Sequence, residues 1–164
     1  MYRRILLFCV LSLTAFAVPE QEVRVISADE VAAYVFPLAG EHRIAIRRFD
    51  PRNLAELSLF SPDSQHGGHI EQIKWSDDHK YLVFSTTSSG GHSPWHFPTY
   101  VFSTDKWAFL LIDDSLPAIT DKSFSFTDSS HITVQTLRNP GADSDDRIST
   151  TIDLDALPWN KKMP

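Results

Sequence analysis

The chain has almost no cysteine. Among its 164 residues only Cys9 is a cysteine, and it lies in an apolar leading segment. The rest of the chain therefore has no disulfide, no thiol nucleophile and no cysteine ligand for a metal. It also has no Asn-x-Ser/Thr sequon. For an exported protein, these absences fit a bacterial periplasm better than the disulfide-rich animal exterior.

The N-terminus has the pattern of a cleavable export signal. Arg3 and Arg4 precede an apolar run that ends in Ala15-Phe16-Ala17, the small-x-small pattern that signal peptidase reads. The run is too short to form a stable membrane anchor. We therefore predict a signal peptide over residues 1–17, a mature domain over residues 18–164 and a periplasmic or secreted location.

Basic charge is also scarce in the mature chain. Cleavage leaves 164 − 17 = 147 residues, with 15 − 2 = 13 basic against 21 acidic side chains, a net charge of −8. Such a balance is poorly suited to a broad surface for nucleic acid or an anionic membrane. No later apolar run approaches the length of a transmembrane helix. The length suits one domain with its own hydrophobic core.

Helical periodicity is scarce, and ten prolines spread through the chain argue against long helices. Only residues 28–34 could support a short helix, and we favour a strand for their second half. Runs rich in β-branched and aromatic residues, bounded by Gly, Pro, Asn, Asp and Ser, predict an all-β protein. The predicted strands are residues 31–36, 43–49, 81–85, 100–103, 109–112, 132–137 and 148–154. Those at 43–47 and 132–135 alternate apolar with polar residues, whereas 82–84 and 109–112 are continuously apolar and predict burial on both faces.

The chain repeats itself weakly. The segment from Lys74 to Ser85, KWSDDHKYLVFS, recurs 51 residues later as SFTDSSHITVQT, and a fainter copy precedes Val31. The common pattern is an aromatic or apolar residue, a hydroxyl residue and an acidic turn, followed by a strand. A period of about 50 residues is in the range of β-propeller blades, which are four-stranded antiparallel sheets.

The segment 74–85 resembles the TolB-type, WD40-like propeller repeat, whose core reads W-S-P-D-G-K before an apolar strand. Asp77 stands where that family has proline, and His79 where it has glycine. The resemblance implies antiparallel blades at about residues 22–60, 70–113 and 121–155, a partial propeller of about three blades. Closed propellers have at least four blades, so a compact β-sandwich or barrel is the alternative. The motif is structural in that family and implies no catalytic residues.

A loop between two predicted strands, SSGGHSPWHFPTY over residues 88–100, is the main candidate site. Long loops on a rigid scaffold often carry function. His92, Trp95, His96 and Phe97 could bind a partner or ligand. Alternatively, the prolines stiffen the loop and Trp95 and Phe97 anchor it on a neighbouring sheet, which is the structural interpretation that we favour.

Four histidines provide a second candidate site. His66 and His69 precede the first strand of the best-matched blade, and His92 and His96 lie in its long loop. If these loops share a face, the four imidazoles could bind zinc, copper or nickel. Otherwise we expect no cofactor.

Signatures of an enzyme are lacking. The sequence has no G-x-S-x-G elbow and no phosphate-binding glycine loop. We expect Asp77 and Asp78 to accept backbone hydrogen bonds in a turn, and Asp143 to Asp146 to form a solvated hairpin turn. We therefore favour a non-enzymatic interaction module that binds an envelope protein or itself, with strand addition at a sheet edge as one mode. The alternative is a metal-binding protein or small metal-dependent enzyme.

Overall fold

A computed structural model describes residues 24–28, 31–38, 41–48, 56–60, 68–87, 96–138 and 146–159. The predicted signal peptide at 1–17 lies outside the described residues. Within them, no helix is long and apolar enough to cross a membrane.

The described part of the chain is all-β, as the sequence predicts. Its only helical element is a short 3₁₀ turn, η1, at Ile112–Ser115. The first four strands are β1 (Arg24–Ala28), β2 (Val31–Leu38), β3 (Glu41–Arg48) and β4 (Glu56–Phe60). The next four are β5 (His69–Trp75), β6 (Tyr81–Thr87), β7 (Thr99–Ser103) and β8 (Ala108–Leu111). The last three are β9 (Ser125–Phe126), β10 (His131–Leu137) and β11 (Arg147–Asp153).

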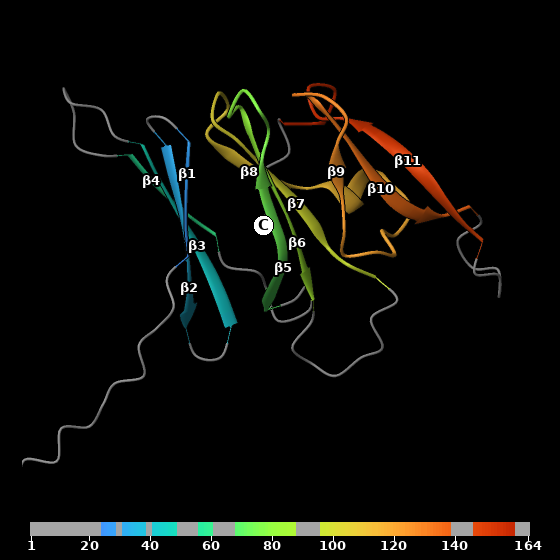
Figure 1. Cartoon of the computed structure of the whole chain (residues 1–164), viewed down its shortest axis with the longest axis horizontal. Coiled ribbons are helices and arrows are strands. Elements are labelled where there is room, and N and C mark those ends of the chain that lie inside the picture. Colours follow the sequence, from blue (N-terminus) through green and yellow to red (C-terminus); the bar gives the residue numbers. More distant parts are fainter. Residues whose placement is uncertain are drawn as a thin grey trace, which may run out of the picture.

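The strands form three separate antiparallel sheets, which lie side by side in chain order (Figure 1). In each sheet the strands follow one another as a meander, with the orders β1-β2-β3-β4, β5-β6-β7-β8 and β9-β10-β11. None of these sheets closes on itself within the described residues, so the barrel alternative does not describe them. The first two sheets have four strands and the third has three.

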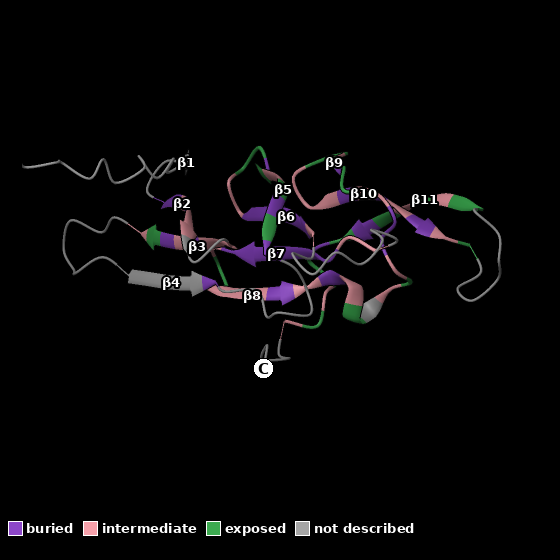
Figure 2. Ribbon diagram, turned by 90° about the horizontal axis from the view of Figure 1, so that it is seen from below, coloured by how far each residue is buried: buried purple, intermediate pink, exposed green. Residues whose placement is uncertain are grey.

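The middle sheet is covered on both faces, as the continuously apolar segment 82–84 predicts (Figure 2). Leu82 and Phe84 pack against the first sheet, whereas Tyr81 and Val83 pack against the third. Successive residues of a strand point to opposite faces, so β6 supplies both cores. The two cores therefore tie the three sheets into one stack.

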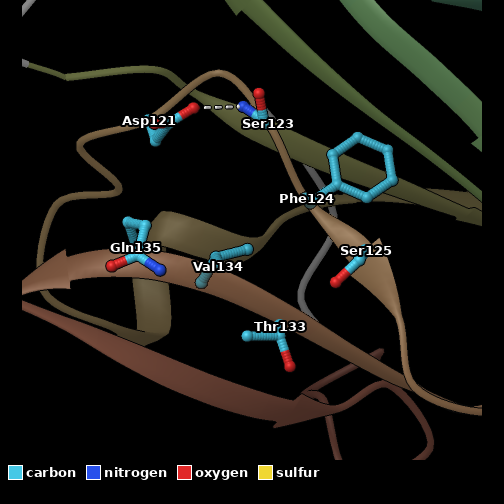
Figure 3. Close-up of a pocket in the computed structure, with 7 residues that line it drawn as sticks. All are labelled: Asp121, Ser123, Phe124, Ser125, Thr133, Val134 and Gln135. Atoms are coloured by element: carbon cyan, nitrogen blue, oxygen red, sulfur yellow. Dashed lines mark hydrogen bonds between the residues drawn. The ribbon is translucent and has the colours of Figure 1, made fainter.

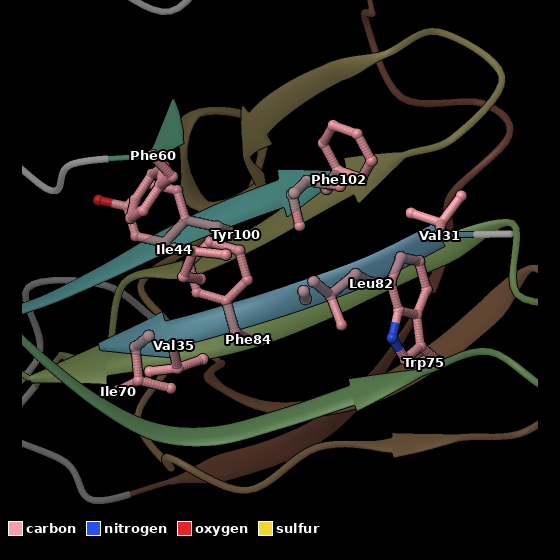
Figure 4. Packing of buried hydrophobic residues seen from close by; sticks show 12 residues of the cluster. Val31, Val35, Ile44, Phe60, Ile70, Trp75, Leu82, Phe84, Tyr100 and Phe102 are labelled. Atoms are coloured by element: carbon pink, nitrogen blue, oxygen red, sulfur yellow. The ribbon is translucent and has the colours of Figure 1, made fainter. Parts of the chain in front are cut away.

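Aromatic rings fill the core between the first and middle sheets (Figure 4). The ring centroid of Phe60, on β4, lies 4.7 Å from that of Tyr100 and 4.9 Å from that of Phe84. Both contacts are edge-to-face, the geometry that aromatic pairs prefer. Burial of each such side chain is worth about 1.5–3 kcal/mol.

The turns at one end of the stack connect the sheets. The Arg48 guanidinium, at the end of β3, lies 4.5 Å from the ring centroid of Trp107 in the β7–β8 turn.

Near the C-terminus, the Trp159 ring stacks on Tyr81 with centroids 6.0 Å apart. Burial raises the pKa of Tyr81 to about 12, so its hydroxyl stays protonated and donates to Asp155 Oδ1 at 2.6 Å.

The two copies of the sequence repeat form hairpins of different length. Trp75 pairs with Leu82 across the first turn, but Phe126 pairs with Ile132 across the second, which is one residue shorter. Equivalent residues of the two hairpins are therefore 51 positions apart before the turn and 50 positions apart after it. His79 has a φ of 59°, a left-handed conformation that glycine adopts easily, at the position where the resembled repeat has glycine.

Candidate functional site

The candidate loop is held firmly where it meets β7. Residues 88–95 lie outside the described residues, and with them His92 and Trp95. Phe97 is half-buried, and its N–H donates to the Ile119 carbonyl at 2.8 Å. The Thr86 N–H donates to the Pro98 carbonyl at 2.9 Å. The last residues of the loop are therefore fixed to β6 and to the segment that leads to the third sheet.

His96 forms an ion pair or hydrogen bond with a buried carboxylate. Its Nε2 lies 2.5 Å from Oδ2 of Asp113, which belongs to η1 and has a side chain 8% exposed. Burial raises the pKa of Asp113, and the His96 contact opposes that rise. The Thr99 amide also favours the charged form, yet Asp113 Oδ1 completes no hydrogen bond within the described residues. The pair can orient an imidazole, but no serine or threonine hydroxyl is recorded against it among those residues.

The two described histidines of the proposed metal set have different partners. The exposed His69 contacts the ring of His42 edge-on, with centroids 5.5 Å apart. His42 in turn accepts the Ile70 N–H at its Nδ1. Across the described residues, no three or more His, Cys, Asp or Glu side chains are grouped to hold a metal. His66 and His92 lie outside those residues, so the four-histidine prediction stays a prediction.

Of the paired aspartates, Asp78 has the structural role that the sequence predicts. Asp78 Oδ1 accepts the Lys80 N–H at 3.1 Å and the Ser76 hydroxyl at 2.7 Å. Asp128 does the same in the second hairpin, where it accepts the Ser130 N–H at 2.8 Å. Both carboxylates therefore satisfy backbone donors of a tight turn. Of the predicted solvated turn at 143–146, only Asp146 is described.

A Ser-x-x-Lys spacing is present at Ser103 and Lys106, and sequence reasoning missed it. This spacing places a nucleophile beside a lysine in some acyl-transfer enzymes. Here Ser103 is fully buried, and its Oγ accepts the backbone N–H of Lys106 at 3.3 Å. The hydroxyl stabilises the β7–β8 turn and does not face a substrate.

A shallow pocket of about 280 Å³ lies where the chain enters the third sheet (Figure 3). It opens because the backbone of Phe124 hydrogen-bonds the side chain of Gln72, on the middle sheet, rather than β10. It is lined by Asp121, Ser123, Phe124, Ser125, Thr133, Val134 and Gln135. The volume is below the range of about 300–1,000 Å³ that is typical of small-molecule sites.

Among the described residues, no strand pairs with the outer side of β11. β11 pairs only with β10 among the described residues, whereas the third strands of the other two sheets, β3 and β7, are each covered by a fourth. Residues 154–159 turn away after β11, and Trp159 packs on Tyr81. We call the side of β11 opposite β10 the free edge of β11.

Two hydrogen bonds that flank the β10–β11 ladder show which backbone groups of β11 point to this edge. The Arg138 N–H donates to the Asp146 carbonyl, and the Leu154 N–H donates to the Ser130 carbonyl. The even-numbered residues of this segment therefore direct their backbone groups toward β10. Because these directions alternate along a strand, the odd-numbered ones direct their N–H and C=O groups to the free edge: Arg147, Ser149, Thr151 and Asp153.

Sequence reasoning named sheet edges only in general terms. The edge strand of the third sheet was predicted at 148–154, but nothing in its residues shows that a fourth strand is lacking. No protein-family model, no curated protein and no solved structure matches this chain.

Proposed function

We propose that this protein is a non-enzymatic interaction module that binds an extended protein segment by strand addition at the free edge of β11. The observation that carries the proposal is the difference between the sheets. Within the part of the chain that the structure describes, two sheets have a fourth strand and the third ends at β11. An added strand would occupy beside β11 the position that β4 has beside β3 and β8 has beside β7. Main-chain hydrogen bonds would supply the affinity.

The composition of β11 supports this role. Natural edge strands usually protect themselves with lysine, proline, bulges or shortness. β11 has seven residues, RISTTID, with no lysine, proline or glycine. Its register with β10 is regular from His131–Asp153 to Leu137–Arg147. Within the described residues it is therefore a regular edge, without a bulge, beside which a second strand could pair.

The arrangement of the sheets supports a propeller-like interpretation of the fold. Three consecutive meanders stacked face to face, in chain order, are what a partial propeller of about three blades requires. The resemblance of residues 74–85 to the TolB-type repeat points the same way. In this interpretation the third blade lacks its outermost strand, and the added segment completes it.

The predicted export signal places the interaction in the periplasm or outside the cell. The partner would then be an envelope protein or a second copy of this chain. Acidic charge on the mature chain favours neither nucleic acid nor an anionic membrane as the partner.

The test uses a seven-residue peptide of alternating threonine and valine and the mature chain, residues 18–164. We expect peptide binding to shift the backbone amide resonances of Arg147, Ser149, Thr151 and Asp153 and to slow their hydrogen exchange. Thr151→Pro removes an N–H that points to the free edge and leaves the ladder with β10 in place. This variant should fold and no longer bind. Shifts confined to residues 96–99 or to the pocket, or binding that survives Thr151→Pro, would contradict the proposal.

A further inference from the structure

We infer that the segment added to β11 is β11 of a second copy, paired antiparallel across a two-fold axis. This inference rests on the proposed function and names the partner. It comes from the sequence of the strand, because RISTTID is complementary to itself when reversed. An isologous dimer requires such self-complementarity.

The register that satisfies this pairing is centred on Thr150. Arg147 then lies opposite Asp153 of the second copy, and Asp153 opposite its Arg147. Opposite charges, β-branched pairs and hydroxyl pairs all stabilise directly opposed positions of an antiparallel ladder. Further in, Ile148 lies opposite Ile152 of the second copy and Ser149 opposite its Thr151.

The backbone geometry agrees with this register. The residues whose N–H and C=O groups face the free edge are the odd-numbered ones, and hydrogen-bonded pairs must join two of them. Centring on Thr150 pairs 147 with 153 and 149 with 151, which are all odd. The neighbouring allowed registers centre on Ser149 or Thr151, and each of them separates Arg147 from the opposing Asp153. The charge pairs therefore select one register.

The charged and hydroxyl side chains of the opposed pairs lie on one face of the sheet, and Asp153 also accepts the Asp155 N–H at its Oδ1. Arg147, Ser149, Thr151 and Asp153 are exposed and lie on the face of the third sheet that points away from the middle sheet. Ile148 and Ile152 lie on the opposite face, where Ile152 is already 5% exposed within one chain. The two copies would form one continuous sheet of 3 + 3 = 6 strands, β9-β10-β11 followed by its symmetry mate.

Charge exchange on the mature chain tests the inference, with the mass measured by light scattering during gel filtration over a range of concentrations. The wild type should form a dimer. Arg147→Asp places two carboxylates opposite each other at both ends of the ladder, and Asp153→Arg places two guanidinium groups there. Each single variant should dimerise at least about tenfold more weakly, because two attractive pairs become repulsive.

Two combinations restore the complementary charges. The double variant Arg147→Asp with Asp153→Arg should dimerise as the wild type does. An equimolar mixture of the two single variants should form a mixed dimer, although neither forms its own. Arg138→Asp changes an exposed arginine beside β10 and away from the free edge, so this matched control should leave the dimer unchanged. Circular dichroism checks that every variant is folded.

The outcomes separate this inference from the proposed function. If the wild type stays monomeric, or if neither single variant dimerises more weakly than the wild type, pairing through β11 is wrong. If the threonine-valine peptide still binds the free edge in that case, the proposed function stands with a different partner. If the peptide also fails to bind, both proposals fail.

Discussion

The side-chain amide of Gln72 hydrogen-bonds both backbone groups of Phe124, which directly precedes β9 of the neighbouring sheet. Its Nε2 donates to the Phe124 carbonyl at 3.0 Å, and its Oε1 accepts the Phe124 N–H at 3.1 Å. Gln72 thus replaces the strand that Phe124 would otherwise pair with. This contact joins the middle and third sheets and opens the pocket beside β10.

Removing this amide should destabilise the protein. Gln72→Ala leaves the N–H and C=O of a 7%-exposed residue without partners, and we expect a loss of about 1–3 kcal/mol in the free energy of unfolding. Urea denaturation measures it. The matched control is Gln135→Ala, which removes a glutamine that bonds the exposed Ser149 hydroxyl and should change the free energy by less than about 0.5 kcal/mol. Equal losses for the two variants would contradict the role of Gln72.

The turn between β5 and β6 should be stabilised by glycine at position 79. His79 has a φ of 59°, and a left-handed conformation costs a residue with a Cβ roughly 1–2 kcal/mol. His79→Gly removes that cost but gains chain entropy in the unfolded state, so we expect a net gain of about 0.5–1 kcal/mol. His79→Ala keeps the Cβ and should give no gain. If alanine stabilises as much as glycine, backbone strain is not the cause.

The buried carboxyl of Asp113 should make stability fall as pH rises. Burial raises the pKa of Asp113 in the folded state above the ordinary value of 3.8. Between pH 3.8 and this raised pKa, the folded state holds the proton more tightly than the unfolded state does. The stabilisation that this carboxyl contributes is complete below pH 3.8 and is lost as the pH rises through the folded pKa. Asp113→Asn cannot ionise, so its unfolding free energy relative to the wild type should increase as the pH rises from 3.8 through the folded pKa of Asp113.

Asp155 provides a control of opposite sign for that experiment. The hydrogen bond from Lys80 lowers the pKa of Asp155 from 3.8, so its contribution is present above pH 3.8 and lost as the pH falls. Asp155→Asn should therefore lose stability relative to the wild type as the pH rises from below the folded pKa of Asp155 to about 3.8. Urea denaturation at several pH values measures both variants, and slopes of the same sign would show that one assignment is wrong.

The contact between Arg48 and Trp107 should be energetically coupled. The guanidinium lies 4.5 Å from the ring centroid, and such cation–π pairs contribute about 0.5–2 kcal/mol. A double-mutant cycle of Arg48→Met and Trp107→Leu, followed by urea denaturation, should give a coupling free energy in this range. Arg48 also donates to the Thr104 carbonyl, and the cycle subtracts this bond because it is lost in both variants that carry the Arg48→Met substitution.

The same cycle on Lys74 and Phe126 provides the comparison. The Lys74 Nζ lies 5.9 Å from the Phe126 ring centroid, near the limit of about 6 Å for this interaction. We expect a smaller coupling there than for the Arg48 pair. A coupling near zero for Arg48 and Trp107 would mean that their proximity adds nothing to stability.

Much of the β-structure could be predicted from the sequence, because apolar periodicity reports how a strand is buried. Residues 43–47 alternate, and β3 buries Ile44 and Ile46 on one face. Residues 82–84 are all apolar, and β6 lies between two sheets. The strands without a prediction of their own, β1, β4, β5 and β9, are all edges of their sheets. An edge strand has one neighbour and tolerates polar residues, so its periodicity is weak.

The candidate site depended more on tertiary structure. Histidine spacing suggested a metal set, but the contacts that pair His69 with His42 and His96 with Asp113 join residues distant along the chain. The aspartate turns were predictable because a carboxylate reaches amides only two residues away.

The sequence by itself determined the all-β class, the burial pattern of the central strands and the self-complementary order of charges in β11. Each of these depends on side-chain chemistry at neighbouring positions. Only the tertiary structure decided that the described strands divide into sheets of four, four and three, and that β11 pairs with β10 alone among them. Strand partners are chosen by contacts between distant residues, and local sequence does not record them.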